Sequence, residues 1–243
     1  MRKYLSFLTI IIFFASLSLI LYKYRRQLPA PQNVIETIVP IPTIVNEKGI
    51  PNIHTIKTAF VPQAPEKNWD QPWQDACEES ALLTVHYYYE SLSPQTSTII
   101  SDLETIFDFE SSEAWGHDIN ISQMATISSK LWGYQSIVID NPTLDELKSY
   151  IAKDIPVIIP ANGKTLYREN KHFKSGGPWY HNLVILGYDD PKKQFIVHDV
   201  GTQFGPYFHY SYQTLLESIH DFPLTLKKED IDSGVPRALV LIK

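Results

Sequence analysis

The sequence predicts an α+β fold, with helices in the first half of the folded part and an antiparallel sheet in the second half. Two observations predict it. Apolar residues recur at helical spacing after capping residues as far as residue 154, and short runs rich in Val, Ile and Tyr follow. Two of these runs are joined by the turn Asp-Asp-Pro-Lys-Lys at 189–193, which is typical of a hairpin. A doubly wound parallel sheet is therefore not expected.

The chain begins with a segment typical of a membrane anchor. Residues 5–22 contain no charge, and as a helix they would extend about 27 Å, close to the thickness of a hydrocarbon core. The run ends directly in Lys-Tyr-Arg-Arg rather than at a small-x-small cleavage site, which favours an uncleaved anchor over a signal peptide. We expect residues 1–26 to form a single-pass transmembrane helix with basic flanks. These flanks do not discriminate the two orientations; we expect the folded domain to be extracytoplasmic.

Residues 27–58 form a predicted linker between the anchor and the domain at 59–243. Five prolines interrupt alternating Val and Ile residues here, a pattern that favours extended backbone over helix. The same Val and Ile residues would also suit an edge strand, so the boundary near residue 58 is soft.

Charge and cysteine content exclude several classes of protein. The formal charge of the 243 residues is −6, and the first 26 carry five bases and no acid, which leaves −11 on the remainder. A domain with this negative charge repels the phosphate backbone of nucleic acids, so no nucleic-acid partner is expected. Cys77 is the one cysteine, so no intramolecular disulfide and no multi-cysteine metal site can form. We expect neither a metal nor a cofactor, and the oligomeric state is not predicted.

The expected helices are defined by their capping signatures. The N-cap and N3 pairs are Asp75 with Glu78, Ser101 with Glu104, Asn120 with Gln123, and Thr143 with Glu146. The last three helices are expected to end near Phe109, Trp132 and Asp154. A further helix is expected at Tyr212–His220.

The expected strands are Gln135–Asp140, Ile155–Pro160, His181–Tyr188, Gln194–Asp199, Tyr207–Tyr210 and Arg237–Ile242. The longest irregular stretch, Asn162–Trp179, is polar and contains glycine, as lids and binding loops often do; a surface excursion has the same composition.

Cys77 falls at the second position of its predicted helix. Unsatisfied N–H groups and the positive end of the helix dipole there favour a thiolate. A cysteine in such a place is also often only a small buried apolar residue.

His181 and Asp199 form the second part of the predicted site. His181 opens one strand directly after the glycine-containing loop, and Asp199 ends the partner strand. The start of one hairpin strand lies beside the end of the next, so the two side chains should be within hydrogen-bonding reach. A nucleophile, a base and an orienting carboxylate are what acyl transfer through a thioester needs.

Four segments, FVPQAP, WQDACEESALLTVHYY, HNLVILGYDD and FIVHDVG, resemble the C39-like branch of the papain-like cysteine peptidases. The resemblance covers residues 59–243. It implies a papain-like fold with the nucleophile at the start of a buried helix that packs on the sheet. It also implies that Cys77 attacks amide bonds of a peptide or protein substrate, that His181 is the general base and acid, and that Asp199 orients it.

Family members complete the oxyanion hole with a glutamine. Gln63 matches the family pattern best, and Gln71 and Gln74 are alternatives. Where many members have Cys-Gly-Pro, this chain has Glu78 and Glu79, which would oppose thiolate formation. We expect Glu78 to cap the helix and Glu79 to face solvent.

Three other functions fit the same residues: peptidoglycan hydrolysis, transglutaminase-like acyl transfer, and binding by a tethered module without activity. Two neighbours of the predicted site also carry expectations. Trp179 should shield the His181 hydrogen bond from water, and His198 should point to the face opposite Asp199.

Overall fold

The structure, a computed structural model, describes residues 49–243. The predicted anchor at 5–22 and the linker as far as residue 48 lie outside these residues. Among residues 49–243, no helix is both long enough and apolar enough to cross a bilayer.

The described residues form a fold of helices packed on one antiparallel sheet. Seven strands make one sheet in the order β2-β7-β3-β4-β5-β6, and β1 pairs with β4; every pairing is antiparallel. The strands are β1 (Ile53–Thr55), β2 (Gln135–Asp140), β3 (Val157–Asn162), β4 (Tyr180–Asp189), β5 (Gln194–Asp199), β6 (Phe208–Ser211) and β7 (Arg237–Ile242). β3 and β4 are buried along their whole length, so they form the centre of the core.

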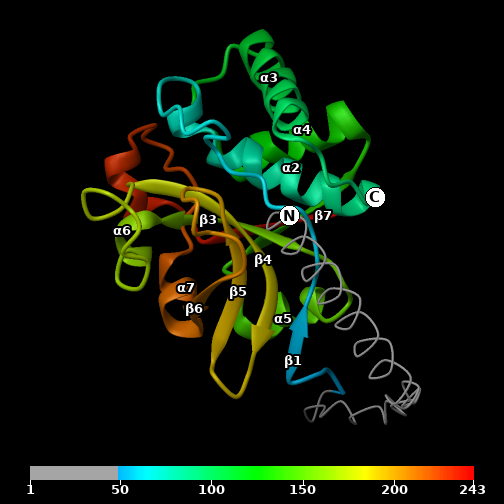
Figure 1. Cartoon of the computed structure of the whole chain (residues 1–243). Helices are drawn as coiled ribbons and strands as arrows, with labels where there is room; N and C mark the ends of the chain where they lie inside the picture. Colours follow the sequence, from blue (N-terminus) through cyan, green and yellow to red (C-terminus); the bar gives the residue numbers. More distant parts are fainter. Residues whose placement is uncertain (1–48) are drawn as a thin grey trace, which may run out of the picture. The chain divides into compact units, whose positions relative to one another are not determined.

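The helices surround this sheet. In Figure 1, α2, α3 and α4 lie together at the top, and α6 and α7 lie together at the left. The helices are η1 (Trp73–Asp75), α2 (Cys77–Glu90), α3 (Thr96–Ser112), α4 (Ile121–Trp132), α5 (Leu144–Ile151), α6 (Gly163–Leu166), α7 (Tyr212–Ser218) and η2 (Lys228–Ser233). Because α2 packs against β4 and every residue from 77 to 85 is buried, the start of α2 is fixed against the middle of the sheet.

Two of the four predicted capping pairs are present. Asn120 with Gln123 and Thr143 with Glu146 both form complete capping boxes, at the starts of α4 and α5. The prediction at Ser101 is wrong, since α3 begins five residues earlier, at Thr96. An earlier start places Ile99 on the same buried stripe as Leu103 and Ile106, so packing decides where the helix begins.

The prediction at Asp75 is also wrong. The N-cap of α2 is Ala76, and no side chain caps this helix. The Asp75 carboxylate accepts hydrogen bonds from Gln71 Nε2 at 2.6 Å and Lys228 Nζ at 3.2 Å instead. Glu78 is thereby left without the capping role expected of it.

The predicted strand bounds agree with the structure at Gln135–Asp140, Gln194–Asp199 and Arg237–Ile242. The other three predicted strands differ from their predicted ranges by one or two residues at each end. The hairpin of β4 and β5 is confirmed: Lys193 N–H donates to Asp190 O in the turn, and Leu183 pairs with Asp199. The predicted loop at 162–179 contains a short helix, α6, and is otherwise irregular.

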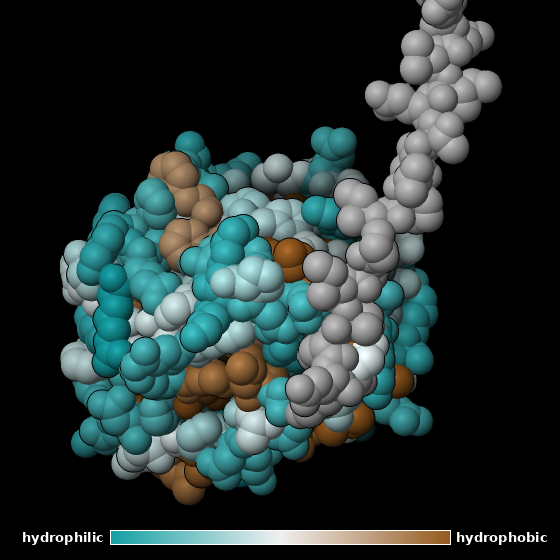
Figure 2. Space-filling view, turned by 90° about the horizontal axis from the view of Figure 1, so that it is seen from below, coloured by the Kyte–Doolittle hydropathy of each residue, from teal (hydrophilic) through white to brown (hydrophobic). Residues whose placement is uncertain are grey.

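The face of the domain in Figure 2 is mostly hydrophilic, with separate small hydrophobic patches. β1, which lies inside the predicted linker, is part of the sheet through its pairing with Gly187, Tyr188 and Asp189 of β4. The edge-strand alternative for the end of the linker is therefore what the structure shows.

Candidate active site

Cys77 is the first residue of α2, and it is 4% exposed. Its sulfur has two hydrogen-bonding contacts. The thiol donates to Glu78 Oε2 at 2.8 Å, and Asn182 Nδ2 of β4 lies 3.9 Å from Sγ. The cysteine is thus held between its own helix and the central strand.

The carboxyl group of Glu78 is fixed at both oxygens. Oε2 accepts from Cys77, and Oε1 accepts from the Ile119 backbone N–H at 3.0 Å. Burial and the neighbouring Glu78 raise the pKa of Cys77 well above its usual value. Burial and Asp118 likewise raise the pKa of Glu78. The expectation that Glu78 would be used up as a helix cap is wrong, because the carboxyl group binds the sulfur.

The expectation that Glu79 faces solvent is wrong, because its side chain is buried, at 1% exposure. Burial and the nearby Glu110 of α3 raise its pKa well above the usual value. Burial also raises the pKa of Glu110 to about 7. Glu79 Oε2 and Glu110 Oε1 have no hydrogen-bond partner among the described residues. The two acids form a buried pair that disfavours double ionisation.

The structure brings His181 and Asp199 together as predicted from the hairpin. His181 Nε2 and Asp199 Oδ1 are 2.8 Å apart, and the side chains are 2% and 0% exposed. Burial raises the pKa of Asp199, but the charge of His181 and several hydrogen bonds outweigh it and lower the pKa below the usual value. Asp199 is therefore a carboxylate at neutral pH.

Two residues that the sequence analysis did not identify complete the shell around Asp199. Tyr210 Oη donates to Oδ2 at 2.6 Å, and Asn170 Nδ2 donates to the same oxygen at 2.8 Å. Asn170 comes from the irregular loop before β4, and Tyr210 from β6. No local signal in the sequence marks either residue, because both act through the tertiary pairing of separate segments.

The aromatic ring against His181 is Phe173, edge-on with 5.3 Å between ring centroids. The residue expected in this role, Trp179, is 41% exposed, and its ring lies 4.9 Å from Lys164 Nζ. Gly201 also contacts the imidazole: a Cβ at this position would lie 2.7 Å from His181 Cε1. The Val-Gly-Thr sequence after Asp199 was a usable signal for this close approach.

Cys77 and His181 are not hydrogen-bonded to each other in residues 49–243. His181 and Asn182 are consecutive on β4, and consecutive side chains of a strand point to opposite faces. Asn182 contacts the sulfur, whereas His181 contacts Asp199. Within the described residues, Nδ1 of His181 has no hydrogen-bond partner. The Cys77–His181 contact stays a prediction.

Of the three candidate glutamines, Gln63 alone is buried, at 4% exposure. Its Nε2 donates to Trp73 O at 3.2 Å and to Gln74 O at 2.7 Å, in the turn that leads into α2. Gln71 and Gln74 are exposed. Gln63 therefore braces the start of α2, and its role at an oxyanion stays a prediction.

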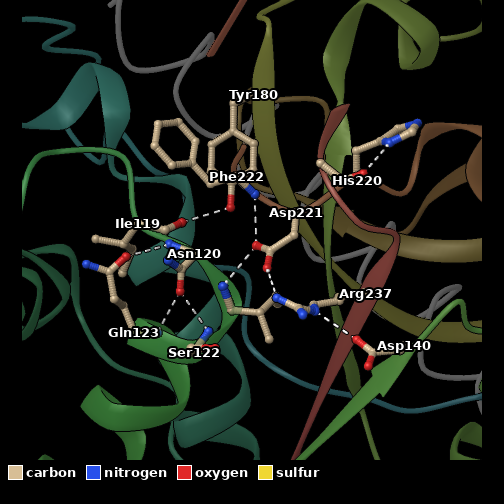
Figure 3. A network of polar contacts seen from close by, with 12 residues as sticks. Ile119, Asn120, Ser122, Gln123, Asp140, Tyr180, His220, Asp221, Phe222 and Arg237 are labelled. Atoms are coloured by element: carbon tan, nitrogen blue, oxygen red, sulfur yellow. Dashed lines mark hydrogen bonds and ion pairs between the residues drawn. The ribbon is translucent and has the colours of Figure 1, made fainter. Parts of the chain in front are cut away.

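A polar network joins the segment before α4 to β4, to β7 and to the segment after α7 (Figure 3). Tyr180 Oη donates to Ile119 O at 2.8 Å, and Asp221 Oδ1 accepts from the backbone of Ile121 at 3.0 Å and Phe222 at 2.8 Å. Arg237 joins Asp221 to Asp140 on β2. Ile119 is thus fixed at both its N–H and its C=O, which in turn fixes Glu78.

His198 is separate from this site. It is buried, its Nδ1 accepts from Tyr207 N at 3.1 Å, and its Nε2 lies 3.4 Å from Thr58 O. Burial lowers its pKa to about 4, so it is neutral at pH 7. In residues 49–243, no group of three His, Cys, Asp or Glu side chains is arranged to hold a metal ion.

Comparison with known proteins gives one family. The model described as Peptidase C39 like family matches residues 56–218. A solved structure of a Bacillus anthracis protein described as a C39-like peptidase is 13% identical, with a TM-score of 0.35, and the match covers 52% of this chain and 60% of that one. No curated protein matches the sequence.

Proposed function

The chain belongs to the Peptidase C39 like family, and we propose that it is a membrane-anchored cysteine peptidase that uses Cys77, His181 and Asp199. The observation that carries the proposal is the buried hydrogen bond between His181 Nε2 and Asp199 Oδ1, at 2.8 Å. This bond uses one ring nitrogen and leaves Nδ1 for proton transfer to and from the nucleophile. Asp199 fixes the ring tautomer and stabilises an imidazolium.

The proposed reaction proceeds through a thioester. Cys77 Sγ attacks the carbonyl carbon of an amide while its proton passes to His181. The C–N bond then breaks as His181 returns the proton to the leaving amine, and the acyl group stays on sulfur. Water attacks the thioester, His181 takes a proton from it, and the acid product and the thiol are released.

Gln63 is the proposed oxyanion donor, since it is the buried glutamine beside the turn before Cys77. Its amide donates to two backbone carbonyls in the resting structure. One of these hydrogen bonds would have to be exchanged for one to the substrate oxygen.

The test is amide cleavage by the full-length chain in detergent, with Cys77→Ala as the matched control. Internally quenched peptides and cell-wall peptide fragments are incubated with each protein, and the released amines and fragments are identified by mass spectrometry. A third arm adds a primary amine acceptor. Cys77-dependent release without coupling to the acceptor supports a peptidase. Coupling supports a transglutaminase-like reaction, and release from cell-wall fragments alone supports peptidoglycan hydrolysis.

The second candidate function is a tethered binding module without activity. It is favoured by the hydrogen bond that holds the Cys77 thiol on Glu78 and by the raised pKa of that thiol. If no amide is cleaved, and wild type and Cys77→Ala bind the same peptides equally, this function replaces the peptidase.

The anchor at residues 1–26 is part of the proposal. It is tested by expressing the full chain and a chain that lacks these residues, followed by separation of membranes and a carbonate wash. Retention of the full chain alone supports the anchor. Protection of residues 59–243 from added protease in intact cells would contradict the extracytoplasmic orientation.

A further inference from the structure

We infer that Glu78 is a positioning residue that keeps Cys77 as a neutral, hydrogen-bonded thiol in the resting protein and must release the sulfur before it can act as a nucleophile. The effect of this restraint on turnover rests on the proposed function, whereas the protonated, hydrogen-bonded state of the Cys77 thiol does not. Glu78 would thus regulate the same site that Cys77 and His181 are proposed to form.

The geometry supports a specific restraint. The Sγ–Oε2 distance is 2.8 Å, and both side chains are almost wholly buried. The second oxygen of Glu78 accepts from Ile119 N–H, and Tyr180 holds the Ile119 carbonyl. The carboxyl group therefore cannot follow the sulfur, and a change in the Cys77 side chain must break their contact.

The titratable groups that act on the sulfur are all acids. Burial, Glu78, Glu79 and Asp118 all act to raise the pKa of Cys77. Asp118 comes from the segment before α4, where Lys228 Nζ lies 3.6 Å from it. Together these groups outweigh the helix start, which by itself would favour a thiolate.

The other titratable groups of the elements beside Cys77 lie on β4 and η2, and each has a partner of its own or stays neutral. Tyr180 is a buried phenol whose raised pKa keeps it neutral, and His181 is engaged by Asp199. Lys228 binds Asp75 as well as Asp118. In the described part of the chain, no cation makes a hydrogen bond to Cys77 to counter the carboxyl groups.

Release needs one rotation. The Cys77 side chain has a single χ angle, with three staggered positions. Leaving the position that faces Glu78 frees the thiol from its acceptor and ends its closest interaction with a carboxyl group. We expect a substrate bound at Cys77 to favour this change, which makes release of the sulfur a step of substrate binding.

The experiment measures the rate at which iodoacetamide alkylates the full-length protein as a function of pH. Glu78→Gln keeps the size of the side chain and an oxygen for Ile119 N–H, but removes the acidic group. Its midpoint should fall by about one pH unit or more relative to wild type, a tenfold change in thiolate fraction. Glu79→Gln is the matched control, because it is equally buried and adjacent but does not contact sulfur. Its shift should be smaller.

An unchanged midpoint in Glu78→Gln, or a shift in Glu79→Gln as large as that in Glu78→Gln, would overturn the inference. Circular dichroism establishes that each variant is folded. Should Glu78→Gln not fold, the S–H stretching band of wild type decides, since Cys77 is the one cysteine of the chain. A band at lower frequency than in the urea-unfolded chain supports the hydrogen bond, and a band at the unfolded position contradicts it.

These outcomes are separable from those for the peptidase. If wild type cleaves nothing but Glu78→Gln shifts the alkylation midpoint, the restraint by Glu78 is supported and the peptidase proposal is contradicted. If wild type cleaves peptides but Glu78→Gln leaves the midpoint unchanged, the peptidase proposal is supported and the restraint is contradicted.

Discussion

Asn182 Nδ2 lies 3.9 Å from the sulfur of Cys77, and the other end of the same amide, Oδ1, is buried without a hydrogen-bond partner in residues 49–243. The preceding residue, His181, instead binds Asp199. Central strand β4 therefore presents two neighbouring polar side chains to two different partners, and the two can be tested independently.

His181→Ala should lower kcat/KM by about 10²–10⁴-fold, the usual loss on removing a general acid–base. The variant should leave the alkylation midpoint of Cys77 unchanged, because the ring is not hydrogen-bonded to the sulfur in the resting structure. Peptide cleavage and iodoacetamide labelling on one preparation check both parts. Wild-type turnover in the variant would remove His181 from the mechanism.

Asp199→Asn should lower activity less than His181→Ala does, because Phe173 and Gly201 still pack against the imidazole and hold part of its orientation. Parallel cleavage assays measure the order of the two losses. A larger loss in Asp199→Asn would mean that the carboxylate does more than orient the ring.

Asp199 should also make the fold sensitive to acid. Its folded pKa is below the unfolded value of about 3.9, so its stabilisation is present above that pH and is lost as pH falls through the folded pKa. The free energy of unfolding, measured in urea, should fall steeply below about pH 4 for wild type and less steeply for Asp199→Asn. Equal slopes for the two proteins would contradict this source of acid sensitivity.

Tyr210→Phe should cost about 1.5–3 kcal/mol of stability, the range for a hydrogen bond to a charged group, and should reduce turnover by loosening Asp199. Tyr212→Phe is the control, since Tyr212 Oη donates at 2.7 Å to the carboxylate of Asp190, outside the site. It should lose stability and keep wild-type turnover. Urea unfolding and cleavage assays distinguish the two variants, and equal turnover in both would exclude a role for Tyr210.

The Glu79–Glu110 pair should make the domain less stable as pH rises. The pKa of Glu110 is raised to about 7 in the folded state, above its unfolded value of about 4.3. The folded state therefore holds its proton more tightly, and stability is lost between these two values as pH increases. Glu110→Gln should remove this loss and be more stable than wild type at pH 8, by about 3–4 kcal/mol at most. Glu104→Gln, on the exposed side of the same helix, should not change the pH dependence.

Local signals predicted those elements whose ends are set locally. The capping boxes of α4 and α5 and the turn between β4 and β5 depend on residues within a few positions of each other, and the structure contains all three. The same hairpin logic placed Asp199 beside His181. The start of α3 could not be predicted in this way, because burial of Ile99 depends on packing against distant elements.

The environment of the nucleophile could not be predicted for the same reason. Position at a helix start favours a low pKa, but the sulfur is buried among carboxyl groups that come from α2 and from the segment before α4. Glu78 looked like a capping residue because its spacing from Asp75 is right. Lys228 and Gln71 bind Asp75 instead, and one of them is more than 150 residues away in sequence.

The short strand β1 has a practical consequence for anyone who truncates this protein. β3 pairs with residues 180–185 of β4, and β1 continues along that flank at 187–189, where His54 O would lie 2.5 Å from a Cβ on Gly187. An expression fragment that starts at residue 59 would lack β1. The backbone amides of β4 that pair with β1 would then be exposed, and exposed strand edges promote self-association. Fragments meant for crystals or assays should start upstream of Ile53, even though the family match begins later.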